Sequence, residues 1–567
     1  MRKIYFLVLS LFSGTLVLAQ NALLIPPVLN GPVYNLNLQT GSVNFYAGTP
    51  TQTMGVNGPV LGPTLIMQKG DSITLNVNNQ IGDTTTMHWH GMHVAPYNDG
   101  GPHTVILPGT TWSPSFTVRD HASTYWYHPH LHHKTNMHVS KGIAGFIIVR
   151  DNEEAGLSLP RTYGVDDIPL ALQTKDFDNN NQITVMSNND DAVMVNATIN
   201  PFVDVPAQVV RLRLLNGSSQ RVFNIGLTNN MNFHVIGTDG GLLNNPVNLT
   251  RLLLSPGERA EILVDLSNFQ GQTINLMSYA AELPNGYYGA TYPGMGPGLV
   301  MTGYNPNPLN GTNFNLLALQ VGAPILGGIT IIPTSLVSNT PIPAAQSNIT
   351  RTLTFMPAQM GPNQLNGDFM INNAMFDMNV INYTIPLNNT EIWTLTNNSA
   401  ISHPFHIHDV PFYILDRNGQ APPLVEQGRK DVVMVRPQEV VRFITQFTTF
   451  SDPMLPYMYH CHMLTHEDGG MMGQFIVSNP NSLEQIPTHE GVRFYPNPTQ
   501  GVLMVSMEEP MDIQQVEAIA LNGQQTTLRF EQQGNNTWIQ MVSLHTGNYM
   551  LILHTKQGII RRMVSKF

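Results

Sequence analysis

The residues best able to do chemistry lie in one short stretch near the end of the chain. It contains His460, Cys461 and His462, followed by His466 and Met471. Cys461 is the only cysteine among the 567 residues, so it cannot form an intramolecular disulfide. A thiolate, neighbouring imidazoles and a thioether form the ligand set of a blue copper centre. The stretch therefore predicts a mononuclear copper site built around Cys461.

The same stretch also predicts a second metal site directly behind the first. In an extended chain, successive side chains point to opposite faces. The rings of His460 and His462 would then point one way and the sulfur of Cys461 the other. We therefore expect two sites back to back, joined by a few covalent bonds along which electrons can pass.

Three more histidine pairs share this H-x-H spacing and predict that the second site is large. The pairs are His88 and His90, His128 and His130, and His406 and His408, with His403 just before the last pair. In a strand, both rings of a pair lie on the same face. Together with the pair beside Cys461, eight imidazoles without clustered carboxylates suit copper and could divide as three, three and two over three ions. Zinc accepts imidazole and thiolate too, but it is redox-inert and would not explain so many histidines beside one sulfur.

An internal repeat links these motifs and predicts the domain architecture. Two blocks recur in the same order, residues 88–91 and 125–130 near the start and residues 403–408 and 457–462 near the end. A degenerate third copy at residues 221–226 has lost every histidine, which predicts a middle domain that is a spacer without metal. Pro129 stands where the last copy has Cys461, so only the last domain can hold a thiolate-bound copper.

The composition favours a β protein and argues against nucleic acid as a partner. Charged residues make up 11% of the chain, the formal net charge is -11, and no basic patch recurs. The chain has 47 glycines and 41 prolines between short runs of β-branched or alternating residues, and no long run has a helical period. The clearest predicted strands are residues 72–77, 209–215, 261–266, 391–395 and 440–447. These features predict an all-β fold of sandwiches or barrels.

The N-terminus has the features of a signal peptide over residues 1–19. Arg2 and Lys3 precede a mainly apolar stretch, and Ala19 ends a cleavage site. No later run of about 18 apolar residues occurs, so we expect no membrane span. The repeat and the shifts in composition then predict a first domain at residues 20–152, a middle domain at 153–335, a third domain at 336–478, a linker at 479–490 and a separate small β domain at 491–567.

The order of the four histidine motifs gives the chain a specific family resemblance. In one-letter code they are H-W-H-G, H-P-H, H-P-F-H-I-H and H-C-H-x3-H-x4-M. Together they resemble the copper motifs of the multicopper oxidases, most closely the bacterial three-domain laccase-like and copper-efflux oxidases, over about residues 30–478. The resemblance implies three cupredoxin domains, each a Greek-key β-sandwich, in an enzyme that passes electrons to O2.

The resemblance also implies a role for each copper ligand. His403, Cys461 and His466 resemble the ligands of one type 1 copper, with Met471 rather than its neighbour Met472 as the weak axial ligand. The remaining histidines resemble the ligands of a cluster between the first and third domains: His88 and His406 for one type 2 ion, His90, His128 and His462 for one type 3 ion, and His130, His408 and His460 for a second type 3 ion.

Two acidic residues match family positions close to this cluster. Asp99 matches an aspartate that family members place near the cluster, and Glu467 matches a proton-relay glutamate of some bacterial members. The resemblance implies that they supply protons for the reduction of O2. The alternative for each is a hydrogen-bond acceptor behind a ligand, or a solvated carboxylate.

The electron donor is less closely specified than the copper sites. Copper-efflux oxidases of this type carry an Asp and a Met just before H-P-F-H-I-H, where residues 399–402 of this chain are Ser-Ala-Ile-Ser. This departure favours a phenolic, laccase-like substrate over Cu(I). The methionines within residues 356–378 and the histidines within residues 132–138 could still gather copper, although core packing and loop positions are the simpler explanations.

Two rival interpretations come from other classes of copper protein. A redox-silent cupredoxin protein would have lost copper ligands, whereas this chain keeps each of them. A two-domain copper nitrite reductase would lack both the middle domain and the H-C-H arrangement.

The last domain resembles the C-terminal sorting domain of the type IX secretion system of Bacteroidota. It begins with residues 494–498, contains an apolar run at residues 547–553 and ends at residues 565–567. The resemblance implies the type IX machinery as a partner, passage through the periplasm and across the outer membrane, and release or display at the cell surface. It also allows for removal of the tail. An ordinary accessory β-sandwich is the alternative.

Overall fold

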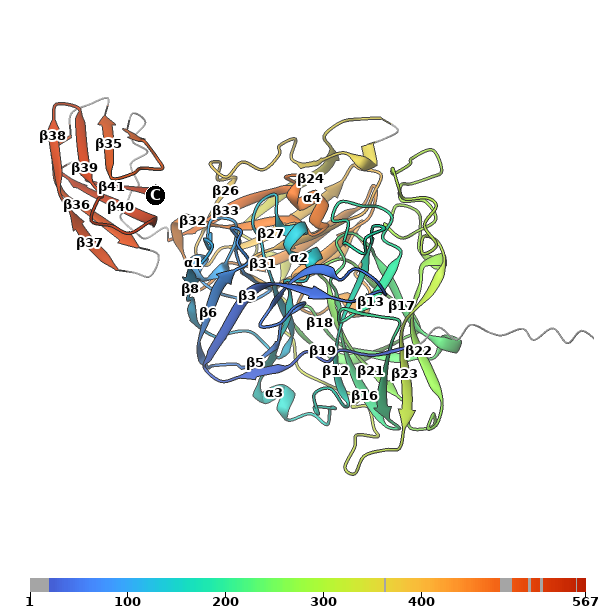
Figure 1. Cartoon of the computed structure of the whole chain (residues 1–567). Helices are drawn as coiled ribbons and strands as arrows, with labels where there is room; N and C mark the ends of the chain where they lie inside the picture. The colour runs from blue at the N-terminus through green and yellow to red at the C-terminus, as the bar shows by residue number, and fades with distance from the viewer. Residues whose placement is uncertain (1–19, 362–363, 480–491, 508–510, 521–523, 557) are drawn as a thin grey trace, which may run out of the picture. The chain divides into compact units, whose positions relative to one another are not determined.

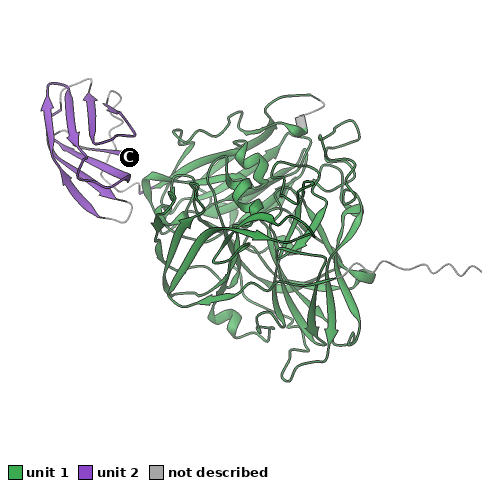
Figure 2. Cartoon of the chain, in the orientation of Figure 1, with its two compact units in different colours: residues 1–477 green, residues 478–567 purple. Residues whose placement is uncertain are grey.

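A computed structural model describes residues 20–361, 364–479, 492–507, 511–520, 524–556 and 558–567. The predicted signal peptide and nearly all of the predicted linker lie outside these residues. The chain divides into two compact units, Met1–Val477 and Ser478–Phe567, which are described separately (Figure 2). No helix in the described part of the chain is long and apolar enough to cross a membrane.

The first sandwich of the large unit encloses one apolar core between two sheets. One sheet has the order β2 (Val28–Asn30), β5 (Thr64–Gln68), β11 (Gly145–Arg150), β10 (Ser123–His128), β7 (His88–His90). The other has the order β4 (Thr51–Val56), β3 (Val33–Val43), β6 (Ser72–Gln80), β8 (Thr111–Trp112), with β9 (Ser115–Thr117) also paired to β6. The predicted alternation in β6 is confirmed, since Ile73, Leu75 and Val77 are buried in this core and the residues between them are not.

The middle sandwich is the largest and encloses a second core. One sheet has the order β1 (Asn21–Ala22), β15 (Pro201–Pro206), β23 (Asn313–Gly322), β22 (Thr273–Tyr279), β17 (Phe223–Leu227), β20 (Leu252–Leu254). The other has the order β14 (Thr198–Ile199), β13 (Ala192–Val195), β12 (Asp167–Lys175), β16 (Val209–Asn216), β21 (Arg259–Asp265), β18 (Phe233–Thr238), β19 (Gly241–Leu249). The predicted strands at residues 209–215 and 261–266 are confirmed as β16 and β21.

One strand departs from the predicted division of the chain. β1 pairs in parallel with β15, so the residues that follow the predicted signal peptide extend the middle sandwich rather than the first. Backbone hydrogen bonds from Asn21 to Asn200 (3.1 Å) and from Leu23 to Phe202 (2.8 Å) fix this pairing. An extended segment can add to any exposed sheet edge that it passes, and its own sequence does not specify which.

The third sandwich encloses the core that contains Cys461. One sheet has the order β25 (Phe369–Ile371), β24 (Ile349–Pro357), β27 (Thr390–Asn397), β31 (Val440–Gln446), β29 (Phe412–Arg417). The other has the order β26 (Tyr383–Pro386), β33 (Met472–Ser478), β32 (Asp452–Cys461), β28 (His403–Ile407), β30 (Val432–Val435). The remaining two predicted strands are confirmed as β27 and β31.

The first and third sandwiches share a cross-strand contact that follows the sequence repeat. Tyr127 of β10 pairs with Gly145 of β11, and Tyr459 of β32 pairs with Gly473 of β33. In both pairs, a side-chain carbon on the glycine would lie 2.2 Å from the tyrosine hydroxyl oxygen. The tyrosine ring therefore lies across the glycine, and only glycine leaves room for it.

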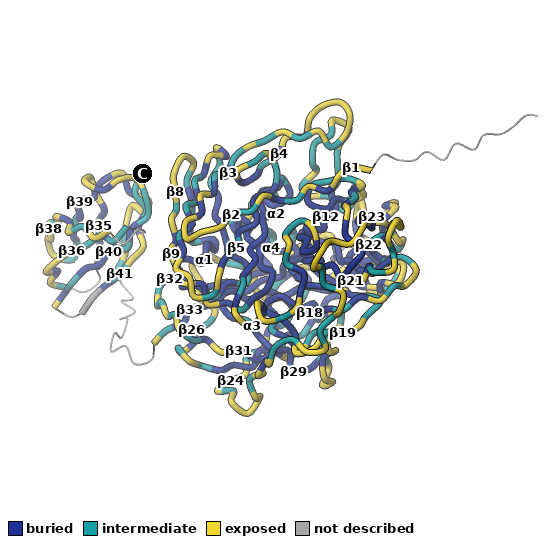
Figure 3. Tube along the Cα trace, turned by 90° about the horizontal axis from the view of Figure 1, so that it is seen from below, coloured by how far each residue is buried: buried dark blue, intermediate teal, exposed yellow. Residues whose placement is uncertain are grey.

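Four short α-helices occur among the described residues, and two of them tie the first sandwich to the third. They are α1 (Pro96–Asp99), α2 (Thr135–Lys141), α3 (Asn152–Ala155) and α4 (Leu464–Asp468). The carboxylate of Asp468 accepts hydrogen bonds from the backbone N–H groups of Thr135 (3.0 Å) and Asn136 (2.9 Å) at the start of α2. As a result α2 and α4 lie together (Figure 1), among the mostly buried segments of the unit (Figure 3).

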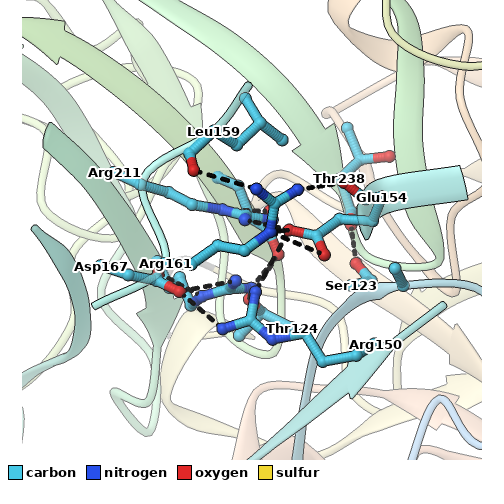
Figure 4. A network of polar contacts seen from close by, with 12 residues as sticks. Ser123, Thr124, Arg150, Glu154, Leu159, Arg161, Asp167, Arg211 and Thr238 are labelled. Atoms are coloured by element: carbon cyan, nitrogen blue, oxygen red, sulfur yellow. Dashed lines mark hydrogen bonds and ion pairs between the residues drawn. The ribbon is translucent and has the colours of Figure 1, made fainter. Parts of the chain in front are cut away.

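Charged side chains cross the boundary between the first and middle sandwiches (Figure 4). Arg213 of β16 donates to Asp167 (2.6 and 3.0 Å) and to Glu261 (2.6 Å), and all three are buried. From the first sandwich, Thr124 donates to Glu261 (2.7 Å) and Arg150 donates to Asp167 (2.9 Å). The boundary is thus fixed by paired charges that have little access to water.

The small unit is a β-sandwich with an apolar core of its own. One sheet has the order β34 (Val492–Tyr495), β35 (Val502–Met507), β39 (Asn536–Gln540), β38 (Phe530–Gln533). The other has the order β37 (Gln525–Leu528), β36 (Ile513–Ala520), β40 (Gly547–Thr555), β41 (Gly558–Lys566).

Candidate metal centre

A sulfur and two ring nitrogens converge in the third sandwich. The Nδ1 atoms of His403 and His466 each lie 3.6 Å from the Sγ atom of Cys461, and all three side chains are buried. His403 begins β28, Cys461 ends β32 and His466 lies in α4. Met471 follows α4, is buried in the same core, and accepts the backbone N–H of Cys461 at 3.1 Å. The structure thus brings together the residues whose spacing predicts a mononuclear site.

The donor types at this site, one sulfur and two imidazole nitrogens, suit a soft cation. Burial raises the pKa of the Cys461 thiol and lowers the pKa of His466 to about 3, so both groups are neutral without a bound ion. The Nε2 atom of His403 lies 2.8 Å from the Ser399 hydroxyl, which leaves Nδ1 to face the sulfur. A cation bound here would displace the thiol proton, as metal binding to cysteine requires.

Eight more histidines, four from the first sandwich and four from the third, form one buried cluster. They are His88, His90, His128, His130, His406, His408, His460 and His462. In the first sandwich, the pairing of β7 with β10 places His88 opposite His128. In the third, the pairing of β28 with β32 places His406 opposite His460. Strand register therefore gathers the H-x-H pairs that are far apart in the sequence.

Ring nitrogens within this cluster face one another closely. Nδ1 of His90 lies 3.3 Å from Nε2 of His128 and 3.2 Å from Nε2 of His462. Nε2 of His130 lies 3.1 Å from Nε2 of His460. Burial lowers the pKa of all five rings, with the neighbouring histidines adding to the effect for most of them. These rings are therefore neutral, and their lone pairs are directed at shared positions.

Among the cluster's ring nitrogens that have no hydrogen-bond partner in the part of the chain that the structure describes, three are Nε2 atoms. They are the Nε2 atoms of His88, His406 and His408, all buried. Leaving a buried polar atom unpaired costs about 1–3 kcal/mol, so such atoms imply a partner. Ring nitrogens of the cluster fall into groups of three that lie within 4.8 Å of one another. Imidazoles in such groups fit bound copper ions.

In the same three histidines, the other ring nitrogen, Nδ1, donates a hydrogen bond to an acceptor. These hydrogen bonds fix the orientation of the rings. Nδ1 of His88 donates to the backbone carbonyl of Asp99, and Nδ1 of His408 donates to the carboxylate of Asp99, each at 2.8 Å. Nδ1 of His406 donates to the backbone carbonyl of Asp431 at 2.8 Å. The nitrogens that face the cluster are therefore set by hydrogen bonds on its outer side.

The two acidic residues predicted from the sequence both contact cluster histidines. Asp99 does so from α1, as described above. The carboxyl group of Glu467, in α4, lies 3.5 Å from Nδ1 of His130 and 3.3 Å from Nδ1 of His460. Burial, and then the neighbouring Asp468, raise the pKa of Glu467 well above its ordinary value.

Cys461 joins the two centres through the backbone. Its sulfur faces His403, whereas the rings of its neighbours His460 and His462 face the cluster. The arrangement matches the alternation expected of an extended chain.

Two charged residues behind the cluster carry no recognisable motif in the sequence. The carboxylate of Asp431 lies 3.1 Å from Nε2 of His90, the ring nitrogen that faces away from the cluster. Arg259, from the middle sandwich, donates to this carboxylate at 2.6 and 2.5 Å. The only sequence signal for either is a charge beside an apolar strand in a chain with few charges.

Other residues noted in the sequence stay outside both centres. Met360, Met375 and Met378 have exposed fractions of 83%, 41% and 39%. The expectation that His138 is a loop residue is wrong, since α2 begins at Thr135. Its ring is buried, with Nδ1 3.2 Å from the hydroxyl of Thr85.

Comparison with known proteins gives consistent matches along the chain. Family models described as multicopper oxidase match residues 37–154, 169–280 and 345–481, and a model described as a secretion system C-terminal sorting domain matches residues 493–566. A multicopper oxidase of Staphylococcus haemolyticus is 32% identical over 456 residues, which cover 79% of this chain and 88% of that protein.

Two solved structures extend this similarity to the fold. A laccase-like multicopper oxidase from Ochrobactrum sp., with oxidase activity towards lignin model compounds, has a TM-score of 0.70 at 33% identity and covers 80% of this chain and 100% of its own. A multicopper oxidase from Campylobacter jejuni, described as a metallo-oxidase, has a TM-score of 0.68 at 25% identity and covers 81% of this chain and 96% of its own. The predicted fold, all-β with cupredoxin-like Greek-key sandwiches and a small C-terminal β domain, is confirmed.

Proposed function

Since the chain belongs to the multicopper oxidase family and is a copper oxidoreductase that uses O2, we propose that it oxidises small phenols and reduces O2 to water. The family predicted from the histidine motifs is thereby confirmed. One observation supports the proposal most directly. A single buried thiol has two imidazole nitrogens 3.6 Å from its sulfur, and both residues beside it belong to the histidine cluster.

We assign four copper ions to the donor groups described above. The groups are His403, Cys461, His466 and Met471 for type 1 copper, His88 and His406 for type 2, His90, His128 and His462 for one type 3 ion, and His130, His408 and His460 for the other. The convergence of neutral donors and the unpaired Nε2 atoms support this assignment. When bound, copper would accept electrons singly at the first group and deliver them to O2 at the others.

Residues around the two centres are assigned the transfer of electrons and the transfer of protons. Cys461 provides an unbroken covalent path from its sulfur to the rings of His460 and His462. Forming two waters from O2 consumes four electrons and four protons, and the cluster is closed to solvent. Asp99 and Glu467 are the acids placed against cluster rings, so we assign them the transfer of protons.

The surroundings of His403 support a neutral organic donor. The hydroxyl of Ser399 forms a hydrogen bond with Nε2 of His403. The ring of Phe369 packs against the rings of His403 and His466, with centroid distances of 4.6 and 4.5 Å. No carboxylate contacts either ring among the described residues. A phenol needs no counter-charge at such an edge, whereas a cation would be better held by an acidic side chain.

Oxidation of Cu(I) is the second candidate, and one observation favours it. The exposed Met375 lies next to the type 1 group, since its methyl carbon is 3.3 Å from the position of a side-chain carbon on Gly470, the neighbour of Met471. Thioethers are soft ligands that suit Cu(I). Met378, also partly exposed, follows three residues later.

The two candidates are separated by oxygen uptake at a fixed O2 concentration. We expect faster uptake with a phenol than with Cu(I), and no change in the phenol rate for Met375→Leu with Met378→Leu. Uptake supported by Cu(I) alone, and lost in that double variant, would favour the metal oxidase. Absence of uptake with both donors by copper-loaded protein would favour the redox-silent interpretation.

We further propose that the small unit directs export through the type IX system to the cell surface, after which it is removed. The match of residues 493–566 to a secretion system C-terminal sorting domain supports this. In cells that have this system, the enzyme should be found outside the outer membrane and shortened. Intact enzyme found only in the periplasm would contradict the proposal.

A further inference from the structure

A loop of the middle sandwich contacts the histidine cluster, although that sandwich holds none of the assigned ligands. Residues 255–258 connect β20 to β21, and Gly257 lies against the ring of His462. A side-chain carbon at Gly257 would lie 2.8 Å from two ring carbons of His462. Gly257 also has a φ of +84°, which residues with a side chain rarely adopt. The contact therefore depends on glycine.

Hydrogen bonds hold this loop in one position. The N–H of Gly257 donates to the carbonyl of Asn216 (2.9 Å), and the N–H of Asn216 donates to the carbonyl of Glu258 (3.1 Å). The carboxylate of Glu258 accepts the N–H of Ser255 at 2.7 Å. Because these bonds anchor the loop to β16, Gly257 presents a rigid surface to the His462 ring.

Arg259, two residues after Gly257, acts on a second ligand, His90, through Asp431. Arg259 begins β21, is buried, and donates to both carboxylate oxygens of Asp431. One of these oxygens accepts the outer Nε2–H of His90 at 3.1 Å. Arg259 also donates to the carbonyl of Thr124 in the first sandwich (3.1 Å). A single guanidinium thus fixes the acceptor that orients the His90 ring.

Further charged residues contact the segments on either side of the ion pair between Arg259 and Asp431. Asp239 accepts the backbone N–H of Arg259 at 2.8 Å and forms an ion pair with Lys430 at 2.9 Å. Lys430 precedes Asp431 and also pairs with Glu258 at 3.0 Å. These contacts link the loop at residues 255–258 to the segment before β30.

We propose that the middle sandwich positions two ligands of one type 3 ion, His462 through Gly257 and His90 through Arg259 with Asp431. This inference rests on the proposed copper assignment. It gives a positioning role to the middle domain, which the sequence predicts to be a spacer without metal. Gly257 and Arg259 are positioning residues, since they act on copper through other side chains. The type 1 group, whose donors touch neither residue, should not depend on them.

A matched pair of glycine variants tests the first contact. Gly271, also in the middle sandwich, has a φ of +80° and no atom within 4 Å of the point where a side-chain carbon would lie, so Gly271→Ala imposes similar backbone strain without touching a ligand. Full-length protein freed of metal is titrated with Cu(II), with copper content, blue absorbance and metal-free melting temperature measured. Relative to Gly271→Ala, Gly257→Ala should weaken cluster copper binding about 10- to 100-fold and leave the blue absorbance per chain unchanged.

A second pair of variants tests the arginine without altering a glycine. Arg251 makes a comparable two-point contact with Glu282 (2.8 and 2.8 Å) at the surface, so Arg251→Lys is the control for Arg259→Lys. Only Arg259→Lys should show the selective loss of cluster copper. If Gly257→Ala fails to fold, the comparison of Arg259→Lys with Arg251→Lys still tests whether the middle sandwich positions the ligands.

The outcomes separate this inference from the proposed function. Cluster copper binding by Gly257→Ala and Arg259→Lys equal to that of their controls would overturn the inference. Wild-type protein that is not blue when loaded with copper would instead contradict the copper assignment.

Discussion

At the scale of single residues, Asp99 contacts two ligands with two different groups. Its carbonyl accepts from His88 and its carboxylate from His408, so the residue could act by orienting rings, by carrying protons, or both. An amide in place of the carboxylate keeps an acceptor for His408 but removes the acid. The substitution Asp99→Asn therefore separates the two roles.

We expect Asp99→Asn to bind copper as the wild type does and to lower O2 turnover about 100-fold, the lower end of what a general acid contributes. Copper analysis and an oxygen electrode measure the two quantities. Asp204→Asn, at an exposed position of β15, serves as the control. Unchanged turnover would leave Asp99 with an orienting role only.

The sequence predicts the donor atoms at this scale but not what holds them. Histidines at H-x-H spacing indicate a shared face wherever a strand forms, so His88, His90 and their counterparts can be recognised without a structure. Asp431 and Arg259 come from segments without a motif and meet His90 only after three sandwiches have packed. Spacing along one chain cannot encode such a meeting.

At the scale of elements, a tyrosine lying across a glycine fixes the strands that carry the ligands. Tyr459 lies beside His460 on β32, so its contact with Gly473 of β33 sets the position of that strand. The first sandwich repeats the contact between Tyr127 and Gly145. The alternation of buried and less buried residues along the strands could be predicted from the sequence. The position of β1 at the edge of the middle sandwich could not, because it depends on which sheet this segment passes.

Gly473→Ala should lower the free energy of unfolding of the metal-free protein by about 1–3 kcal/mol, because the added methyl overpacks the tyrosine ring. Chemical denaturation followed by tryptophan fluorescence measures the change. Gly58→Ala is the control, since a side-chain carbon there would meet only a backbone oxygen of Val56 at 3.9 Å. Equal stability of the two variants would contradict the packing argument.

The charged boundary between the first and middle sandwiches predicts acid sensitivity. Burial alone would raise the pKa of Asp167 and Glu261, but Arg211 and Arg213 hold the pKa of both below its ordinary value. Their contribution to stability is therefore present above the unfolded pKa of about 4 and is lost as the pH falls through the folded pKa. In the metal-free protein, the buried cluster histidines whose pKa is lowered already make the unfolding midpoint fall as the pH drops through about 6.5, the pKa of an unfolded histidine. We expect these boundary carboxylates to add a further fall below about pH 4.

The same measurement on Asp167→Asn provides the check. This variant should be less stable at neutral pH, because Arg213 loses a buried partner, and should lose less stability on acidification. An acid response as steep as that of the wild type would assign the sensitivity to other carboxylates.

At the scale of the whole molecule, the residues assigned as copper ligands and the sorting domain belong to different units. Each assigned ligand lies within Met1–Val477, and the small unit has its own core. Protein that ends at Ser478 should therefore bind copper and consume O2 at the rate of the full chain. A loss of either property on truncation would show that the small unit supports the enzyme as well as its export.

The proposed function depends on one sulfur, that of Cys461, which connects a mononuclear electron acceptor to an O2-reducing cluster. Copper content, visible absorption and O2 uptake with a phenol, measured together on wild type and Cys461→Ser, test it most directly. The wild type should be blue and consume O2, and the variant should hold one copper fewer, be colourless and consume none. A colourless wild type at full copper loading, or undiminished O2 uptake by Cys461→Ser, would contradict the proposed function.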